Sequence, residues 1–151
     1  METTGQAEME GRLVEPLQAR AYMLAGAARV TLVSVKTGTR FTYRIAVKDE
    51  GRVAFVGALV GADNERDFAF LGTIFDGARF AHGRKSRIGA DAPSVKAFAW
   101  AWAALSAGRV PETLEIWHEG RCGRCGRALT VPGSIASGIG PECAKKMGGG
   151  S

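Results

Sequence analysis

A regular alternation of apolar and polar residues in the middle of the chain constrains the fold more than any other sequence feature. From Arg29 onward the hydrophobic period is two, the period of a β-strand that buries one face. Turn sequences at residues 37–39 and 49–51 interrupt the alternation. Strands joined by such short turns pair antiparallel. The sequence therefore predicts a four-stranded antiparallel meander, with strands at residues 29–35, 40–48, 52–60 and 68–75.

Two segments that flank this meander have helical periodicity instead. Residues 13–28 carry Pro16 in their first turn, a position where proline favours helix formation. The sequence Asp91-Ala92-Pro93-Ser94 is typical of the start of a second helix, and Gly108 marks the end of that helix. The apolar residues between them recur at helical spacing, at Val95, Phe98, Trp102 and Leu105. We therefore predict an α+β fold with the helices on one face of the meander, and with Trp100 pointing away from the buried stripe.

All three cysteines lie near the C-terminal end, at Cys122, Cys125 and Cys143. A spacing of two residues lets both thiolates of the first pair reach one metal ion, and glycine tolerates the required turn. His118 precedes Cys122 by four residues and can supply a nitrogen ligand. Pro141 before Cys143 is typical of the first turn of a short helix. We predict a structural Zn²⁺ held by His118, Cys122, Cys125 and Cys143 in a treble-clef-like module.

More than one group could serve as the fourth ligand of this site. A complete treble clef takes two ligands from its last helix, so Glu142 or a water molecule could replace His118, which could instead be a packed side chain beside Trp117. A Cys-x-x-Cys pair can also be a redox centre, but such centres follow a strand within a βαβ unit, whereas arginines and glycines flank this pair. An odd number of cysteines and no recognisable signal peptide argue against an extracellular disulfide framework.

Residues 117–147 resemble a small cysteine-containing domain found at the ends of uncharacterised bacterial and bacteriophage proteins. The resemblance rests on Cys-Gly-Arg-Cys-Gly at 122–126 and Gly-Ile-Gly-Pro-Glu-Cys at 138–143, and it is looser over residues 28–110. It implies a zinc-binding module and a phage or mobile-element setting, and it implies no activity. One departure is Gly133, which stands where an acidic residue is expected.

These features divide the chain into four predicted parts. Residues 1–12 form a polar, disordered tail, and residues 148–151 are an added Gly-Gly-Gly-Ser linker. Residues 13–110 form the α+β domain, and residues 111–147 form the zinc-binding module. No run of residues approaches the roughly 20 apolar residues of a membrane span. We therefore expect no membrane association, and reduced cysteines place the protein in the cytoplasm of a bacterial host cell.

The formal charge of +5 favours polyanionic partners, and the excess lies in the C-terminal half. The motif Gly138-Ile139-Gly140 can offer backbone N–H groups to a phosphate, although these glycines could simply shape the loop that carries Cys143. The expected function is binding of DNA or RNA with little sequence specificity. The predicted contact residues form three basic clusters: Arg84, Lys85 and Arg87; Arg121, Arg124 and Arg127; and Lys145 and Lys146.

Two other classes of function compete with nucleic-acid binding. A protein-interaction module that docks on a host enzyme and modulates it is the alternative, and an exposed Trp100 would favour it. An enzyme is not expected. A zinc deaminase needs His-x-Glu well before its cysteine pair and an open position for water, whereas Glu119 directly follows His118 here. The chain also has no Walker loop and no dinucleotide-binding fingerprint.

Overall fold

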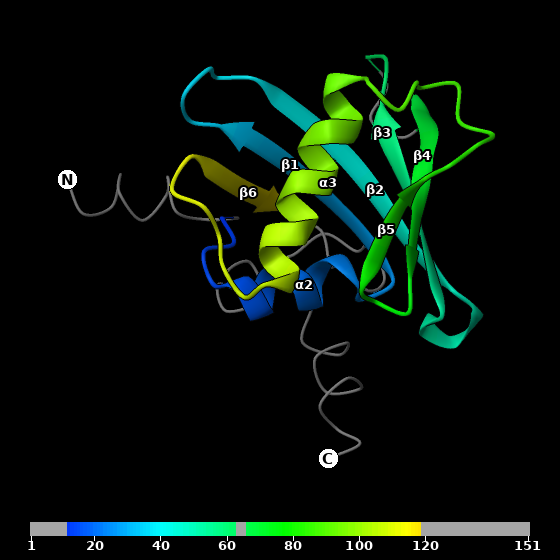
Figure 1. Ribbon diagram of the computed structural model, residues 1–151, viewed down its shortest axis with the longest axis horizontal. Helices are drawn as coiled ribbons and strands as arrows, with labels where there is room; N and C mark the ends of the chain where they lie inside the picture. Colours follow the sequence, from blue (N-terminus) through cyan, green and yellow to red (C-terminus); the bar gives the residue numbers. More distant parts are fainter. Residues whose placement is uncertain (1–11, 63–65, 119–151) are drawn as a thin grey trace.

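The computed structural model describes residues 12–62 and 66–118, in which one antiparallel sheet carries two helices (Figure 1). The predicted α+β class and all four strands of the predicted meander are confirmed. Those strands are β1 (Ala27–Ser34), β2 (Arg40–Lys48), β3 (Val53–Leu59) and β4 (Phe68–Phe75). A 3₁₀ turn, η1 (Asp49–Gly51), joins β2 to β3 where the turn was predicted.

The sheet nevertheless has six strands rather than four, in the order β5-β4-β3-β2-β1-β6. Strand β5 (Arg79–His82) forms a hairpin with β4, and β6 (Leu114–His118) pairs with β1. Residues 114–118, which belong to the predicted zinc-binding module, are thus an edge strand of the sheet. The alternation of buried Leu114 and Ile116 with partly buried Glu115 and Trp117 extends over five residues, too few to separate a strand from a connection.

The N-terminal helix α2 (Pro16–Met23) is shorter than the predicted segment 13–28. At its start, the Leu13 N–H donates a hydrogen bond to the Ile116 carbonyl at 2.7 Å, so Leu13 belongs to the edge of the sheet. At its end, Gly26 has a φ of 147°, which breaks the helix and lets β1 begin at Ala27. Glu15 caps the helix by accepting a hydrogen bond from the Gln18 N–H at 3.1 Å.

Helix α3 (Pro93–Ser106) begins and ends close to its predicted bounds. The predicted stripe is buried: Val95, Phe98, Trp102 and Leu105. Trp100 is 47% exposed, as its position off this stripe predicts. Neither helix in the described part of the chain has the length and apolar character needed to cross a bilayer.

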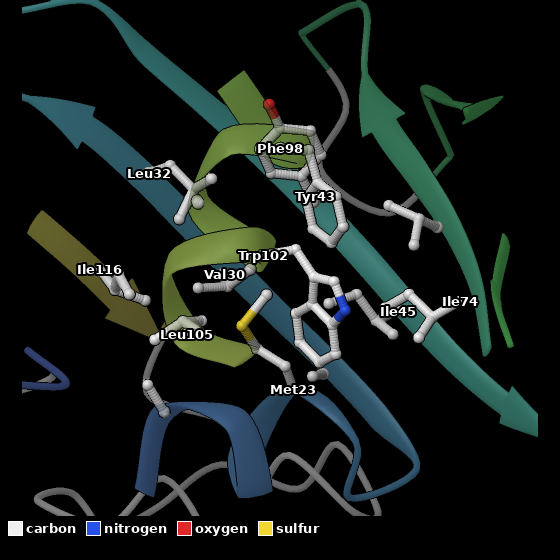
Figure 2. Packing of buried hydrophobic residues seen from close by; sticks show 14 of the residues in the cluster. Met23, Val30, Leu32, Tyr43, Ile45, Ile74, Phe98, Trp102, Leu105 and Ile116 are labelled. Atoms are coloured by element: carbon white, nitrogen blue, oxygen red, sulfur yellow. The ribbon is translucent and has the colours of Figure 1, made fainter. Parts of the chain in front are cut away.

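Both described helices cover the same face of the sheet, where one hydrophobic core joins α2, α3 and the strands (Figures 1 and 2). The Tyr43 hydroxyl on β2 donates to the Ser94 carbonyl at 2.6 Å and fixes the start of α3 over the sheet. Burial raises the pKa of Tyr43 above its ordinary value, so this hydroxyl stays a hydrogen-bond donor even in alkaline solution. The opposite face of the sheet, named the helix-free face here, carries no helix from residues 12–62 or 66–118.

Candidate nucleic-acid interface

The loop that joins β5 to α3 carries three of the predicted contact residues, and all three are exposed: Arg84, Lys85 and Arg87. We name residues 84–87 the basic loop. The hydroxyl of Ser86 anchors it, because it donates to the Phe70 carbonyl at 2.5 Å and accepts from the Ile88 N–H at 3.0 Å. The His82 Nε2 lies 2.7 Å from the Ile88 carbonyl oxygen. Internal hydrogen bonds thus hold the loop backbone while its cations face solvent.

The basic loop lies directly beside β4. The Gly83 N–H donates to the Leu71 carbonyl at 3.0 Å, which continues the ladder past the end of β5. A side chain at Gly83 would collide with the ring of Phe70, so glycine permits the close approach of the loop to that ring. Phe70 itself is 38% exposed. The basic loop and an exposed aromatic ring are therefore neighbours on the surface.

Of the four predicted zinc ligands, the structure describes His118 alone. This histidine is buried at the end of β6, where it pairs with Val30 across the sheet, and its ring centroid lies 5.6 Å from that of Tyr22. One imidazole and three thiolates are a donor set that structural zinc sites use. Within residues 12–62 and 66–118 there is no group of three or more His, Cys, Asp or Glu side chains that could hold a metal ion.

The remaining predicted site residues lie outside the described residues. These are Cys122, Cys125 and Cys143 among the ligands, and Arg121, Arg124, Arg127, Lys145 and Lys146 among the cations. Their roles as zinc ligands and as phosphate contacts stay predictions.

The helix-free face carries a set of cations that sequence reasoning did not assign to the site. In β1 the residues Ala28, Val30 and Leu32 are buried against the helices, so Arg29 between them lies on the opposite face. Register pairs Arg29 with Arg44 of β2. By the same alternation this face holds every lysine and arginine of the six strands: Arg29, Arg40, Arg44, Lys48 and Arg79.

The six described strands contain one carboxylate, that of Glu115 on β6, which lies on the same face. Its Oε1 accepts a hydrogen bond from the Trp117 indole at 3.0 Å, and its Oε2 lies 4.0 Å from the Arg12 guanidinium. The strands thus place five cations on this face and one carboxylate, which already has partners. The helix-free face therefore has a net positive charge.

Aromatic rings hold several of these cations in place. The guanidinium of Arg44 lies 4.9 Å from the ring centroid of Phe68, and that of Arg29 lies 5.7 Å from the same centroid. Arg79 stands 4.6 Å from the ring of Phe75. Cation–π contacts of this kind limit the motion of the long arginine side chains. The charges are therefore partly ordered before any ligand arrives.

The sequence did contain part of this signal. In β2 the polar residues Arg40, Thr42, Arg44 and Lys48 alternate with apolar ones, which places them on one face. What the sequence did not show is the register that sets Arg44 beside Gly57 of β3, and Gly57 beside Phe70 of β4. Only the register between neighbouring strands gathers the arginines and phenylalanines into one surface.

A different surface surrounds Trp100 on α3. Together with Phe41, Leu32 and Leu114 it lines a shallow hollow between α3 and the strands β1, β2 and β6. The lining of this hollow is largely apolar and contains neither lysine nor arginine. Such a surface suits an apolar side chain of a protein partner better than a polyanion.

Comparison with known protein families gives a match for the C-terminal segment. Residues 115–148 match a family of unknown function (DUF6011). The predicted resemblance to an uncharacterised family is thereby confirmed for the C-terminal segment, and the match assigns no metal, ligand or activity. No curated protein and no solved structure matches the chain.

Proposed function

We propose that this protein binds nucleic acid with little sequence specificity, and that it acts as a binding protein rather than an enzyme in the cytoplasm of a bacterial host. The observation that supports this most strongly is the charge of the helix-free face, where five cations stand against one paired carboxylate. The three cations of the basic loop lie at the edge of the same surface. Together these eight cations lie on one face of the sheet and at its border, where they could contact phosphates of one nucleic-acid strand.

The physical basis of this binding is counterion release. Each phosphate neutralised by a lysine or arginine frees condensed counterions, so log K falls by about 0.7–0.9 per contact for each unit of log salt concentration. Contacts to phosphates carry no direct sequence information. Little sequence specificity is therefore expected. The basic residues at positions 121, 124, 127, 145 and 146 are proposed to add further phosphate contacts.

Reversal of the basic loop tests its part in this function. Replacing Arg84, Lys85 and Arg87 by glutamate should weaken binding to single-stranded DNA and lower the magnitude of the salt slope by about 2, because three phosphate contacts disappear. Fluorescence anisotropy across a salt series measures both quantities. The matched control replaces Lys36, Lys96 and Arg109 by glutamate, three cations outside the basic loop and the helix-free face. Equal losses in both variants would contradict a specific role of the loop.

We also propose that residues 117–147 hold one structural Zn²⁺ through His118, Cys122, Cys125 and Cys143. The donor set supports this, because three thiolates and an imidazole close a tetrahedral site with no position left for catalytic water. A buried histidine suits such a closed site. Binding of the metal would supply folding free energy to the C-terminal segment, in a treble-clef-like arrangement.

Metal analysis tests the zinc proposal. The purified protein should contain about one zinc per chain, and Cys143→Ser should lower that content severalfold, because three ligands hold zinc much less tightly than four. His82→Asn serves as the control, since His82 bonds to Ile88 within the basic-loop region and should leave the zinc content unchanged. A wild-type protein without zinc, or full zinc content in Cys143→Ser, would overturn the assignment.

A second candidate function is a protein-interaction module that docks on a host enzyme. The exposed Trp100 and the apolar hollow beside it favour this alternative. A complex that resists nuclease and moderate salt and is lost in Trp100→Ala would establish it. Binding that disappears in salt and survives Trp100→Ala would support nucleic-acid binding instead.

A further inference from the structure

Two phenylalanines are exposed side by side on the helix-free face. Phe55 of β3 is 43% exposed and Phe70 of β4 is 38% exposed. Their ring centroids are 6.2 Å apart, and the rings meet edge to face. Each ring thus leaves much of its surface open to a ligand. Exposed aromatic groups within a charged surface commonly mark an interaction site.

A hollow lies beside these two rings because the residues at its floor are small. Gly57 contributes no side chain and Ala46 contributes a methyl group. The rest of the lining comes from Arg44, Val56, Phe68 and the two exposed phenylalanines. A Cβ at Gly57 would stand 3.5 Å from the Ala69 carbonyl oxygen, an ordinary contact, so the backbone itself does not require glycine there. The absence of a side chain at Gly57 keeps the hollow open between aromatic walls.

Charge surrounds the hollow on the side of β1 and β2. Arg44 lines it directly, and Arg29 lies behind Arg44, with both guanidinium groups above the ring of Phe68. Guanidinium groups therefore cover the ring of Phe68, whereas the rings of Phe55 and Phe70 remain available for stacking with a ligand. On the other side, the basic loop lies against Phe70. The hollow thus has aromatic faces in its centre and cations at two of its borders.

We infer that the helix-free face binds single-stranded nucleic acid, with bases stacked on Phe55 and Phe70 and phosphates held by Arg44, Arg29 and the basic loop. This inference rests on the proposed function and specifies its ligand. Every base has a π-face, so stacking on aromatic side chains tolerates any sequence. In a duplex the base faces are covered by neighbouring base pairs, and only an unpaired strand can offer them.

The charge of the face selects this ligand over an apolar protein segment. An apolar protein segment laid on the face would bury Arg44, which has no carboxylate partner among the described residues, at a high cost in desolvation. A single strand supplies a phosphate for each base, so charge and stacking are satisfied together.

Replacement of both open rings tests the inference. Phe55→Leu combined with Phe70→Leu should weaken binding of an oligothymidine about tenfold, while the salt slope and the affinity for a duplex of equal length stay unchanged, because no cation is lost. Wild-type protein should bind the oligothymidine more tightly than the duplex. Trp100→Leu is the matched control, since it removes an exposed ring from α3 on the other face of the sheet and should leave all affinities unchanged.

The failures of the two proposals are distinguishable. If no polyanion binds at low salt, the proposed function fails and this inference fails with it. If duplex and single strand bind equally and the double leucine variant binds both like wild type, the stacking inference is wrong while nucleic-acid binding stands. Ultraviolet crosslinking of oligothymidine to the wild-type protein needs no variant: adducts on the peptides that contain Phe55 or Phe70 support the inference, and adducts confined to other peptides overturn it.

Discussion

Replacement of Trp102 by alanine is expected to lower the free energy of unfolding by about 3–5 kcal/mol, the usual cost of removing a large buried aromatic side chain. Trp102 is 2% exposed and stacks on Phe98, with 6.3 Å between ring centroids. Its indole N–H donates to the Ala78 carbonyl at 2.9 Å, and the Arg20 guanidinium lies 5.8 Å from its ring centroid. The substitution therefore opens a cavity between α2, α3 and the sheet, and it also removes a hydrogen bond.

Urea denaturation followed by circular dichroism measures this loss. Trp100→Ala is the matched control, because Trp100 lies on the same helix and is 47% exposed, and its replacement should change the stability by less than about 1 kcal/mol. Comparable losses for the two variants would mean that α3 does not pack on the sheet through the face that contains Trp102 (Figure 2).

Reversing the charge of Arg29 and Arg44 to glutamate is expected to weaken binding of any nucleic acid by about 100-fold at low salt. The two residues are directly paired across β1 and β2, so the change places two carboxylates in the middle of the helix-free face. Each substitution removes a phosphate contact and adds a repulsive charge. The loss should affect single strands and duplexes alike, because both present phosphates.

Anisotropy titrations with a single-stranded and a double-stranded probe measure this effect. The control variant reverses Lys96 on α3 and Arg109 just after it, which changes the net charge by the same amount away from the helix-free face. Thermal unfolding shows whether the loss of the contacts to Phe68 disturbs the fold. A hundredfold loss in the control as well would show that net charge alone governs binding, and would contradict a defined interface.

The periodicity of the sequence was enough to predict the central sheet and α3. The alternation in β1 and β2 reflects real burial on one face, and Pro93 and Gly108 mark the ends of the helical segment. In β5 and β6 the alternation extends over too few residues to identify a strand. Edge strands of four or five residues gain their identity from a partner strand, and local sequence does not reveal that partner.

The candidate site was predictable only in part, for a related reason. The basic loop follows from a local run of charge, so composition is enough to find it. The helix-free face depends on the register between four successive strands, which the periodicity within each strand does not fix. Phe55 and Phe70 each read as ordinary core residues within their own apolar strands, and a bulge between Val56 and Gly57 alters the pairing between them. Their exposure is a property of the tertiary structure.

The most direct test of the interface is an NMR titration of isotope-labelled protein with an oligothymidine at low salt. We predict that amide shift changes cluster on the helix-free face and the basic loop, at Arg44, Phe55, Phe70 and Lys85, while the amides around Trp100 remain unchanged. Shift changes centred on Trp100 and α3, or none at saturating oligonucleotide, would contradict nucleic-acid binding by this face of the sheet.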